Sequence, residues 1–207
     1  MTQTIVHRVQ PGELDRAAAA VGAAFFDEVV STWVIPDPVQ REQLLPHHLR
    51  ELVAKALERG EVLAAADFGA VSVWLDREAG ESESNGFPEA VDVPPGLREI
   101  ARRGMLVAEL TEARHPTHTA HVYLPCIGVL PNHRGFGLGS ALLRDKLDRA
   151  DAAELPVYLE ASSTRNRALY RRHGFESSGD PIRFPDGPEI YPMWREPRKP
   201  RESSAQV

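Results

Sequence analysis

The segment Ile127-Gly-Val-Leu-Pro-Asn-His-Arg-Gly-Phe-Gly-Leu-Gly-Ser140 decides the fold of this 207-residue chain. Its apolar start predicts a strand ending at Val129, and the regularly spaced leucines that follow predict a helix from about Leu138. The glycines between them let backbone N–H groups approach an anion, and a helix start adds free donors and the positive end of a dipole. Arg134 adds a fixed cation. The segment therefore predicts a phosphate or diphosphate site.

Two familiar phosphate loops fit this segment poorly. A nucleoside-triphosphate loop needs Lys-Ser or Lys-Thr after its last glycine, whereas Gly139 is followed by Ser140 and alanine. A dinucleotide-binding oxidoreductase needs G-x-G-x-x-G directly after the strand, with an acid, here Glu160, about 20 residues on. The glycines alternate instead, and five residues separate Val129 from Gly135. This makes the oxidoreductase the weaker alternative, and a tight turn whose glycines serve packing remains another.

Strand and helix patterns alternate along the rest of the chain. A loop containing Trp33 is expected after the first helix. Apolar alternation predicts strands at residues 5–9, 61–66, 70–75, 120–129, 157–161, 176–182 and 188–193. Helical spacing predicts helices at residues 11–26, 45–57, 97–110, 138–151 and 165–173. Such a mixture predicts an α/β sheet with helices on both faces.

Composition and charge limit which classes of protein and partner the chain is compatible with. The length fits one domain, residues 1–195, with an insertion at 77–118 and a disordered tail at 196–207. A net charge of −6 gives no general attraction to nucleic acid or to an anionic membrane. The longest apolar run, residues 17–26, is too short to cross a bilayer. Cys126 has no partner for an intrachain disulfide, which favours a reducing, cytoplasmic location, and it is expected to act as a small core residue.

Two motifs carry a family resemblance. Arg134-x-x-Gly137-x-Gly139 resembles the signature of the GNAT superfamily of N-acetyltransferases, and Asn166-x-x-x-Tyr170-x-x-x-Gly174-Phe175 is similar to its second motif. The segment 123–175 is most like puromycin N-acetyltransferase-type members. The resemblance implies an α/β (α+β) fold of GNAT type, with a mixed, mostly antiparallel central sheet, a split between strands 4 and 5, and helices on both faces. It also implies an acetyl-CoA-dependent N-acetyltransferase that acetylates the primary amine of a small molecule by direct attack in a ternary complex.

The resemblance implies where acetyl-CoA would bind, within a core at residues 119–176. The loop 134–140 would hold the diphosphate, and the backbone of the preceding strand would pair with the pantetheine arm. The implied residues are Ile127, Gly128, Val129, Arg134, Gly135, Phe136, Gly137, Leu138, Gly139, Ser140 and Asn166. Pro125 in that strand marks either the bulge the family has there or the end of an edge strand.

The resemblance assigns Tyr170 as the general acid that protonates the departing sulfur; a merely buried tyrosine is the alternative. Glu160 shares a strand face with Tyr158 and is the first choice for the general base, with His121 second. Glu160 could instead be a surface carboxylate paired with Arg165 or Arg167. A main-chain N–H near the bulge would hold the oxyanion, as in the family.

The acceptor pocket is expected to draw on Trp33, His121 and Tyr123. Aromatic walls suit a small aromatic or nucleoside amine, whereas the acidic residues of the insertion suit a polyamine or basic peptide. His115, His118 and His121 recur every third residue, but Pro116 interrupts a helix there, so no metal is expected. A homodimer is possible. The alternative function is a non-catalytic acyl-CoA-binding sensor.

Overall fold

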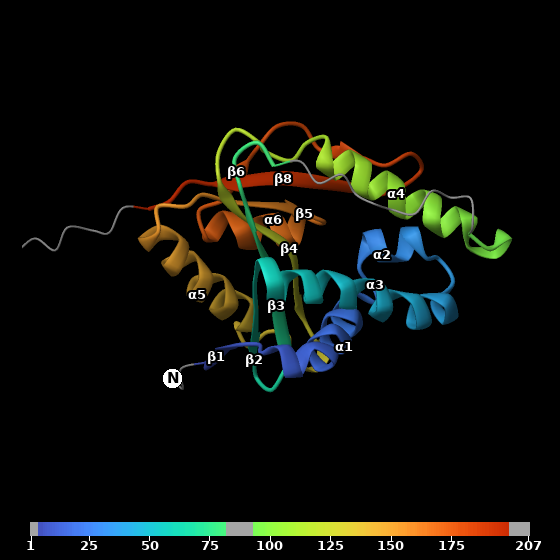
Figure 1. The fold of residues 1–207 in the computed structure, drawn as a ribbon, viewed down its shortest axis with the longest axis horizontal. Helices are drawn as coiled ribbons and strands as arrows, with labels where there is room; N and C mark the ends of the chain where they lie inside the picture. Colours follow the sequence, from blue (N-terminus) through green and yellow to red (C-terminus); the bar gives the residue numbers. More distant parts are fainter. Residues whose placement is uncertain (1–3, 82–92, 199–207) are drawn as a thin grey trace, which may run out of the picture.

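The structure, a computed structural model, describes residues 4–81 and 93–198. Its central sheet has the strand order β1-β2-β3-β4-β5-β8-β6, with β7 paired to β8 (Figure 1). All pairs are antiparallel except β4 with β5. The strands are β1 (Val6–Arg8), β2 (Gly60–Ala65), β3 (Ala70–Arg77), β4 (His121–Val129), β5 (Val157–Ala161), β6 (Glu176–Ser177), β7 (Ile182–Arg183) and β8 (Glu189–Arg195). This mixed, mostly antiparallel sheet is the predicted one.

Helices cover both faces of the sheet. The helices are α1 (Leu14–Phe25), α2 (Val29–Val34), α3 (Pro38–Arg59), α4 (Arg98–Glu112), α5 (Leu138–Ala152) and α6 (Thr164–Arg172), with short 3-10 turns η1 (Pro11–Glu13), η3 (Pro95–Leu97) and η4 (Pro131–His133). Leucines of α5 pack with Leu124 and Leu159 on one face. Residues of α1 and α3 pack with Val71 and Cys126 on the other. Because strand side chains alternate, these two cores account for both faces of β3 and β4.

The parallel pair β4–β5 parts soon after it begins. Only two rungs join the strands, Val122 opposite Val157 and Tyr123 opposite Tyr158. Beyond them β5 stays paired with β8 through Ala161, and β4 stays paired with β3 through Val129. The facing edges of the two strands are therefore unpaired with each other. This is the predicted split between strands 4 and 5.

A bulge lies in β4 at the start of the split. The β3–β4 register shifts, because Val73 is opposite Cys126 whereas Leu75 is opposite Tyr123. Two residues, Leu124 and Pro125, thus face Trp74 alone, which defines a bulge. The extra residue reverses the alternation: Leu124 lies in the core under α5, and Cys126 lies in the core under α1 and α3. Pro125 is therefore the bulge residue of a central strand, and the edge-strand alternative is wrong.

Three predicted elements differ from the structure. The loop around Trp33 contains α2, which is too short for its periodicity to be read from sequence. The helix expected at 45–57 begins earlier, because Asp37 caps its N-terminus and Pro46 is tolerated inside it. The strand expected at 176–182 is two short strands, β6 and β7. The predicted disorder of the tail lies, beyond residue 198, outside the described residues. Of the acidic residues expected in the insertion, Glu78 and Glu81 are described and Glu81 pairs with Arg59, whereas Glu83 and Glu89 lie in the undescribed stretch 82–92.

A buried ionic network joins the first strands to α5. Glu61 on β2, only 3% exposed, accepts hydrogen bonds from Arg8, Lys146 and Arg149. Although burial alone would raise its pKa, the hydrogen bonds and charges of Arg149 and Lys146 lower the Glu61 pKa to about 2. The network connects β1, β2 and α5.

In the described part of the chain, no helix combines the length and apolar character that crossing a bilayer requires.

Candidate active site

The glycine loop, residues 134–140, joins the end of β4 to the start of α5. Gly135 and Gly137 have φ of +88° and +77°, a conformation that favours glycine, and Gly137 is the N-cap of α5. The amide of Ala141 donates to the Gly137 carbonyl, so the helical hydrogen bonds begin there. The three amides before it, at residues 138–140, belong to the first turn, which has no intrahelical partners. The loop thus presents free N–H donors at the mouth of the split.

The backbone of β4 beyond the bulge also faces the split. Leu130 donates its N–H to the Gly69 carbonyl on the β3 side. Peptide groups alternate in direction along a strand, so those of Ile127 and Val129 point the other way, toward the open edge. Arg134 donates from Nε to the Val129 carbonyl over 3.1 Å, which positions its guanidinium beside this edge. An extended chain laid along the edge would find main-chain donors and acceptors there.

Tyr170 reaches the split from α6. Its side chain is buried in the core under α5, and its ring packs edge-on against Phe175 at 5.8 Å. Within residues 4–81 and 93–198, no hydrogen-bond partner is present for its hydroxyl. Burial is the main cause that raises the pKa of the Tyr170 hydroxyl, and the nearby Cys126 and Glu28 raise it further. The phenol therefore stays protonated. The general-acid role of Tyr170 stays a prediction.

Asn166 lies one turn before Tyr170 on α6. Its backbone N–H is capped by Ser163 Oγ, and its Nδ2 lies 3.4 Å from Ser162 Oγ. Farther along the helix, His173 Nε2 lies 3.2 Å from Ser140 Oγ. This contact joins the end of α6 to the first turn of α5.

Glu160 lies on β5 just past the last rung that joins β4 and β5. Tyr123 donates from its hydroxyl to Glu160 Oε2 over 2.9 Å, whereas Glu160 Oε1 is buried without a hydrogen-bond partner among the described residues. Burial raises the Glu160 pKa to about 7, against the opposing effect of the Tyr123 hydrogen bond. No ion pair joins Glu160 to Arg165 or Arg167 in the described chain, so the surface-pair alternative is wrong.

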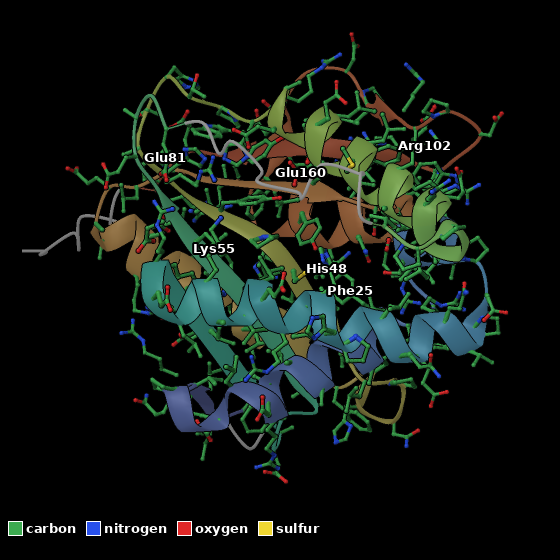
Figure 2. The ribbon with its side chains drawn as sticks, turned by 45° about the vertical axis from the view of Figure 1, so that its right-hand side comes forward. Phe25, His48, Lys55, Glu81, Arg102 and Glu160 are labelled. Carbon is green, nitrogen blue, oxygen red and sulfur yellow. The ribbon has the colours of Figure 1, made fainter. Side chains whose placement is uncertain are left out.

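Glu160 and Tyr170 belong to opposite faces of β5. Leu159, between Tyr158 and Glu160 on the strand, faces the core that contains Tyr170. Alternation turns Glu160 and Tyr158 to the other side, where α4 ends. Figure 2 shows Glu160 near α4. Because β4 has left β5 at this point, no rung between the two strands lies beside Glu160.

An aromatic cluster borders Glu160. It consists of His115, His121, Tyr123, Tyr158 and Trp194, in mutual ring contact. His121 Nδ1 must donate to the Thr119 carbonyl at 2.9 Å, so its Nε2 accepts from His115 Nε2 at 3.0 Å when both rings are neutral. Burial lowers the pKa of both histidines, and that of His115 falls to about 3. Among described residues, no group of three or more His, Cys, Asp or Glu is arranged to hold a metal.

Trp33 lies elsewhere. Its ring stacks on Phe184 with centroids 5.3 Å apart, and the Arg103 guanidinium covers it at 5.1 Å. It belongs to a third small core made by α2, α4 and the β7–β8 hairpin. The structure therefore brings His121 and Tyr123 together beside Glu160, but it does not bring Trp33 to them.

Sequence reasoning missed Glu28. Its Oε2 accepts hydrogen bonds from the amides of Val30 and Ser31, which caps α2, while Oε1 is buried with no partner among the described residues. It raises the pKa of both Cys126 and Tyr170, which places its charge near the split. A six-residue helix gives too little periodicity to be recognised, and glutamate is not a typical N-cap, so the sequence carried no clear signal.

The mixed sheet with its parallel, early-parting β4–β5 pair and helices on both faces is the GNAT fold. Residues 100–177 match a family model described as an acetyltransferase (GNAT) domain. The fold also aligns with a crystal structure described as histone acetyltransferase HPA2 and related acetyltransferase from Corynebacterium glutamicum, with a TM-score of 0.68 and 23% identity over 97% of this chain and 99% of that one.

Two other similarities point to the same class. An uncharacterized N-acetyltransferase of Schizosaccharomyces pombe is 26% identical over 191 residues, covering 81% of this chain and 72% of that protein. A polyamine N-acetyltransferase of Drosophila melanogaster, described as forming N-acetylagmatine, aligns with a TM-score of 0.64 and 20% identity over 92% of this chain and 98% of that one. The family-model match and the S. pombe relative support an N-acetyltransferase, whereas the D. melanogaster structure supports the fold.

Proposed function

We propose that the chain is an acetyl-CoA-dependent N-acetyltransferase that acetylates the primary amine of a small molecule. The observation that carries this proposal is the split after Tyr123 and Tyr158, with Glu160 on one face of β5, Tyr170 on the other, and the glycine loop at its mouth. A thioester lying in the split would have a carboxylate on one side and a phenol on the other.

The glycine loop would hold the diphosphate of acetyl-CoA. The free amides at residues 138–140 and the dipole of α5 favour an anion, and Arg134 adds positive charge. Gly135 and Gly137 leave the approach open, since a Cβ at either meets nothing within 4 Å. The pantetheine arm would pair with the backbone of Ile127 and with the N–H of Val129, because the Val129 carbonyl already accepts from Arg134. These features support a fit between this chain and acetyl-CoA.

Glu160 would act as the general base. With a pKa near 7, about half of this carboxyl is ionised at neutral pH and can remove a proton from the acceptor ammonium. The amine nitrogen then forms a bond to the acetyl carbon while the carbon–sulfur bond breaks. Tyr170 donates its phenolic proton to the sulfur that leaves. The acylated nitrogen then releases its second proton, which restores the phenol of Tyr170. The products are the N-acetylated amine and the free thiol of coenzyme A, and no acyl-enzyme is required.

His121 is the weaker choice for the base. Both of its ring nitrogens are engaged, Nδ1 with the Thr119 carbonyl and Nε2 with His115. Burial lowers its pKa, so it is a poor proton acceptor. His121 and Tyr123 serve better as walls of the acceptor pocket beside Glu160.

Five expectations from the sequence stay predictions. They are the roles of Trp33 and Asn166, the likeness to puromycin N-acetyltransferase-type members, the homodimer and the cytoplasmic location.

A thiol-release assay tests the proposal. The protein is mixed with acetyl-CoA and a panel of primary amines, and free coenzyme A is measured with a thiol reagent. Amine-dependent, steady-state release of thiol with a matching N-acetylated product is expected. Acetyl-CoA binding without turnover on any amine would favour the non-catalytic sensor instead.

A further inference from the structure

We propose that Tyr158 is a positioning residue for Glu160, whose hydroxyl donates to the second oxygen of the carboxylate when that carboxylate is ionised. This inference rests on the proposed function and extends it to the group that holds the base. It starts from two polar atoms on one face of β5, the Tyr158 hydroxyl and Glu160 Oε1. Both are buried, and both lack a hydrogen-bond partner among the described residues.

Two phenols act on the carboxylate of Glu160. Tyr123 and Tyr158 lie opposite each other at the last rung of the β4–β5 ladder, with ring centroids 5.8 Å apart. Tyr123 already donates to Glu160 Oε2 over 2.9 Å, so that oxygen is engaged. Tyr158 and Glu160 are two residues apart on β5 and therefore lie on the same side of the strand. The second phenol is thus placed for the second carboxylate oxygen.

The ring of Tyr158 is held where it is by its neighbours. Its side chain is 0% exposed, and its ring centroid lies 4.9 Å from that of His115 and 6.4 Å from that of Trp194. A buried hydroxyl without a partner costs free energy that a phenylalanine in the same space would not cost. A hydrogen bond to an ionised carboxylate offsets this cost. The unpaired hydroxyl therefore indicates a role that begins when the base carries its charge.

The charges around the pair agree with this role. Burial raises the Glu160 pKa, whereas the hydroxyls of Tyr123 and Tyr158 lower it. Glu112, at the end of α4, raises it. Burial also raises the Tyr158 pKa and Glu160 raises it further, while Arg114 lowers it. The phenol therefore stays protonated and is the donor, and the carboxylate is the acceptor.

The two histidines of the aromatic cluster do not ionise near pH 7. His115 and His121 lie with their Nε2 atoms 3.0 Å apart, and burial lowers the pKa of both. Ionisation of Glu160 is therefore the change of charge to which the Tyr158 hydroxyl can respond near neutral pH.

Nuclear magnetic resonance of protein labelled with [ζ-13C]tyrosine tests the inference without relying on activity. The chain has four tyrosines, so each signal can be assigned by a substitution to phenylalanine. As Glu160 ionises, the signals of Tyr123 and Tyr158 should both shift, with a midpoint near pH 7. In Glu160→Gln this shift of the Tyr158 signal should be lost. Tyr191 is the control, because its hydroxyl lies 3.3 Å from Oε2 of a different carboxylate, Glu189.

Tyr158→Phe gives the second test. The lost hydroxyl has no partner among the described residues, so the fold should be retained. Without this donor the ionised carboxylate is less stable, so the pKa that governs kcat/KM should rise by about 1, as expected when a hydrogen bond to a charged group is lost. Tyr191→Phe should keep the wild-type pH profile.

The outcomes separate the inference from the proposed function. A wild-type Tyr158 signal that does not respond between pH 4 and 9 overturns the inference, and so does an unchanged pH profile in folded Tyr158→Phe. A Tyr158 signal that follows Glu160 in a protein that releases no thiol would support the inference while contradicting the proposed catalysis.

Discussion

Tyr123 and Glu160 are joined across the last rung of the β4–β5 ladder. Tyr123 lies opposite Tyr158 in the register, and its hydroxyl donates to the carboxylate two residues farther along β5 over 2.9 Å. The hydrogen bond therefore spans the point where the strands part. It holds Glu160 at the entrance of the split, in surroundings that raise its pKa to about 7.

The raised pKa of Glu160 predicts a pH profile. A base must be deprotonated to act, so kcat/KM should rise with pH through about 7, well below the titration of the acceptor amine near pH 10. Glu160→Gln should lose this rise and about 10²-fold of kcat/KM. Initial rates of thiol release from pH 5.5 to 9 measure both. A variant that keeps the wild-type rise near pH 7 would show that another group is the base.

Tyr170→Phe should separate chemistry from binding. The Tyr170 hydroxyl has no hydrogen-bond partner among the described residues, so its removal leaves no described group unsatisfied and the fold should be retained. Loss of a general acid should lower kcat about 10²-fold, while the Kd for acetyl-CoA stays within about twofold. Steady-state kinetics measures kcat, and calorimetry measures the Kd for acetyl-CoA. Unchanged kcat would remove Tyr170 from the proton transfer.

Gly137 should tolerate substitution poorly. Its φ of +77° costs an L-residue about 1–2 kcal/mol, and it caps the helix whose amides face the diphosphate. Gly137→Ala should therefore lower the free energy of unfolding by about 1 kcal/mol and weaken acetyl-CoA binding. Gly96→Ala is a matched control, because its Cβ meets nothing and its φ is ordinary. Equal acetyl-CoA affinity in both variants would mean that the loop geometry does not matter for binding.

Glu61 should be important for stability and not for catalysis. Glu61→Gln leaves Lys146 and Arg149 without their buried carboxylate, and breaking such a pair typically costs about 3–5 kcal/mol. The lowered pKa means that the wild-type contribution is present above about pH 4.5 and is lost as pH falls toward 2. Urea unfolding at pH 7 and at pH 3 measures this. A loss near that of the exposed control Glu42→Gln would contradict the role of the network.

The sequence predicted much of this architecture because its second half combines strong local signals. Val157–Ala161 is a strand with the predicted bounds, and the glycine loop joins the predicted strand to the predicted helix. The sequence allowed two interpretations of Pro125, a bulge within a strand or the end of an edge strand. Proline occurs at both kinds of position, so its presence alone does not predict the register shift. The stacking of Trp33 on Phe184 and the position of Glu28 depend on contacts between distant segments, which local patterns do not encode.

Calorimetry with acetyl-CoA and S-acetylpantetheine tests the central claim most directly, because the second compound keeps the thioester arm and lacks the diphosphate. If the amides at residues 138–140 and Arg134 hold the diphosphate, acetyl-CoA should give a saturable heat and bind at least tenfold more tightly than S-acetylpantetheine. No heat with acetyl-CoA, or equal affinity for the two compounds, would contradict the claim.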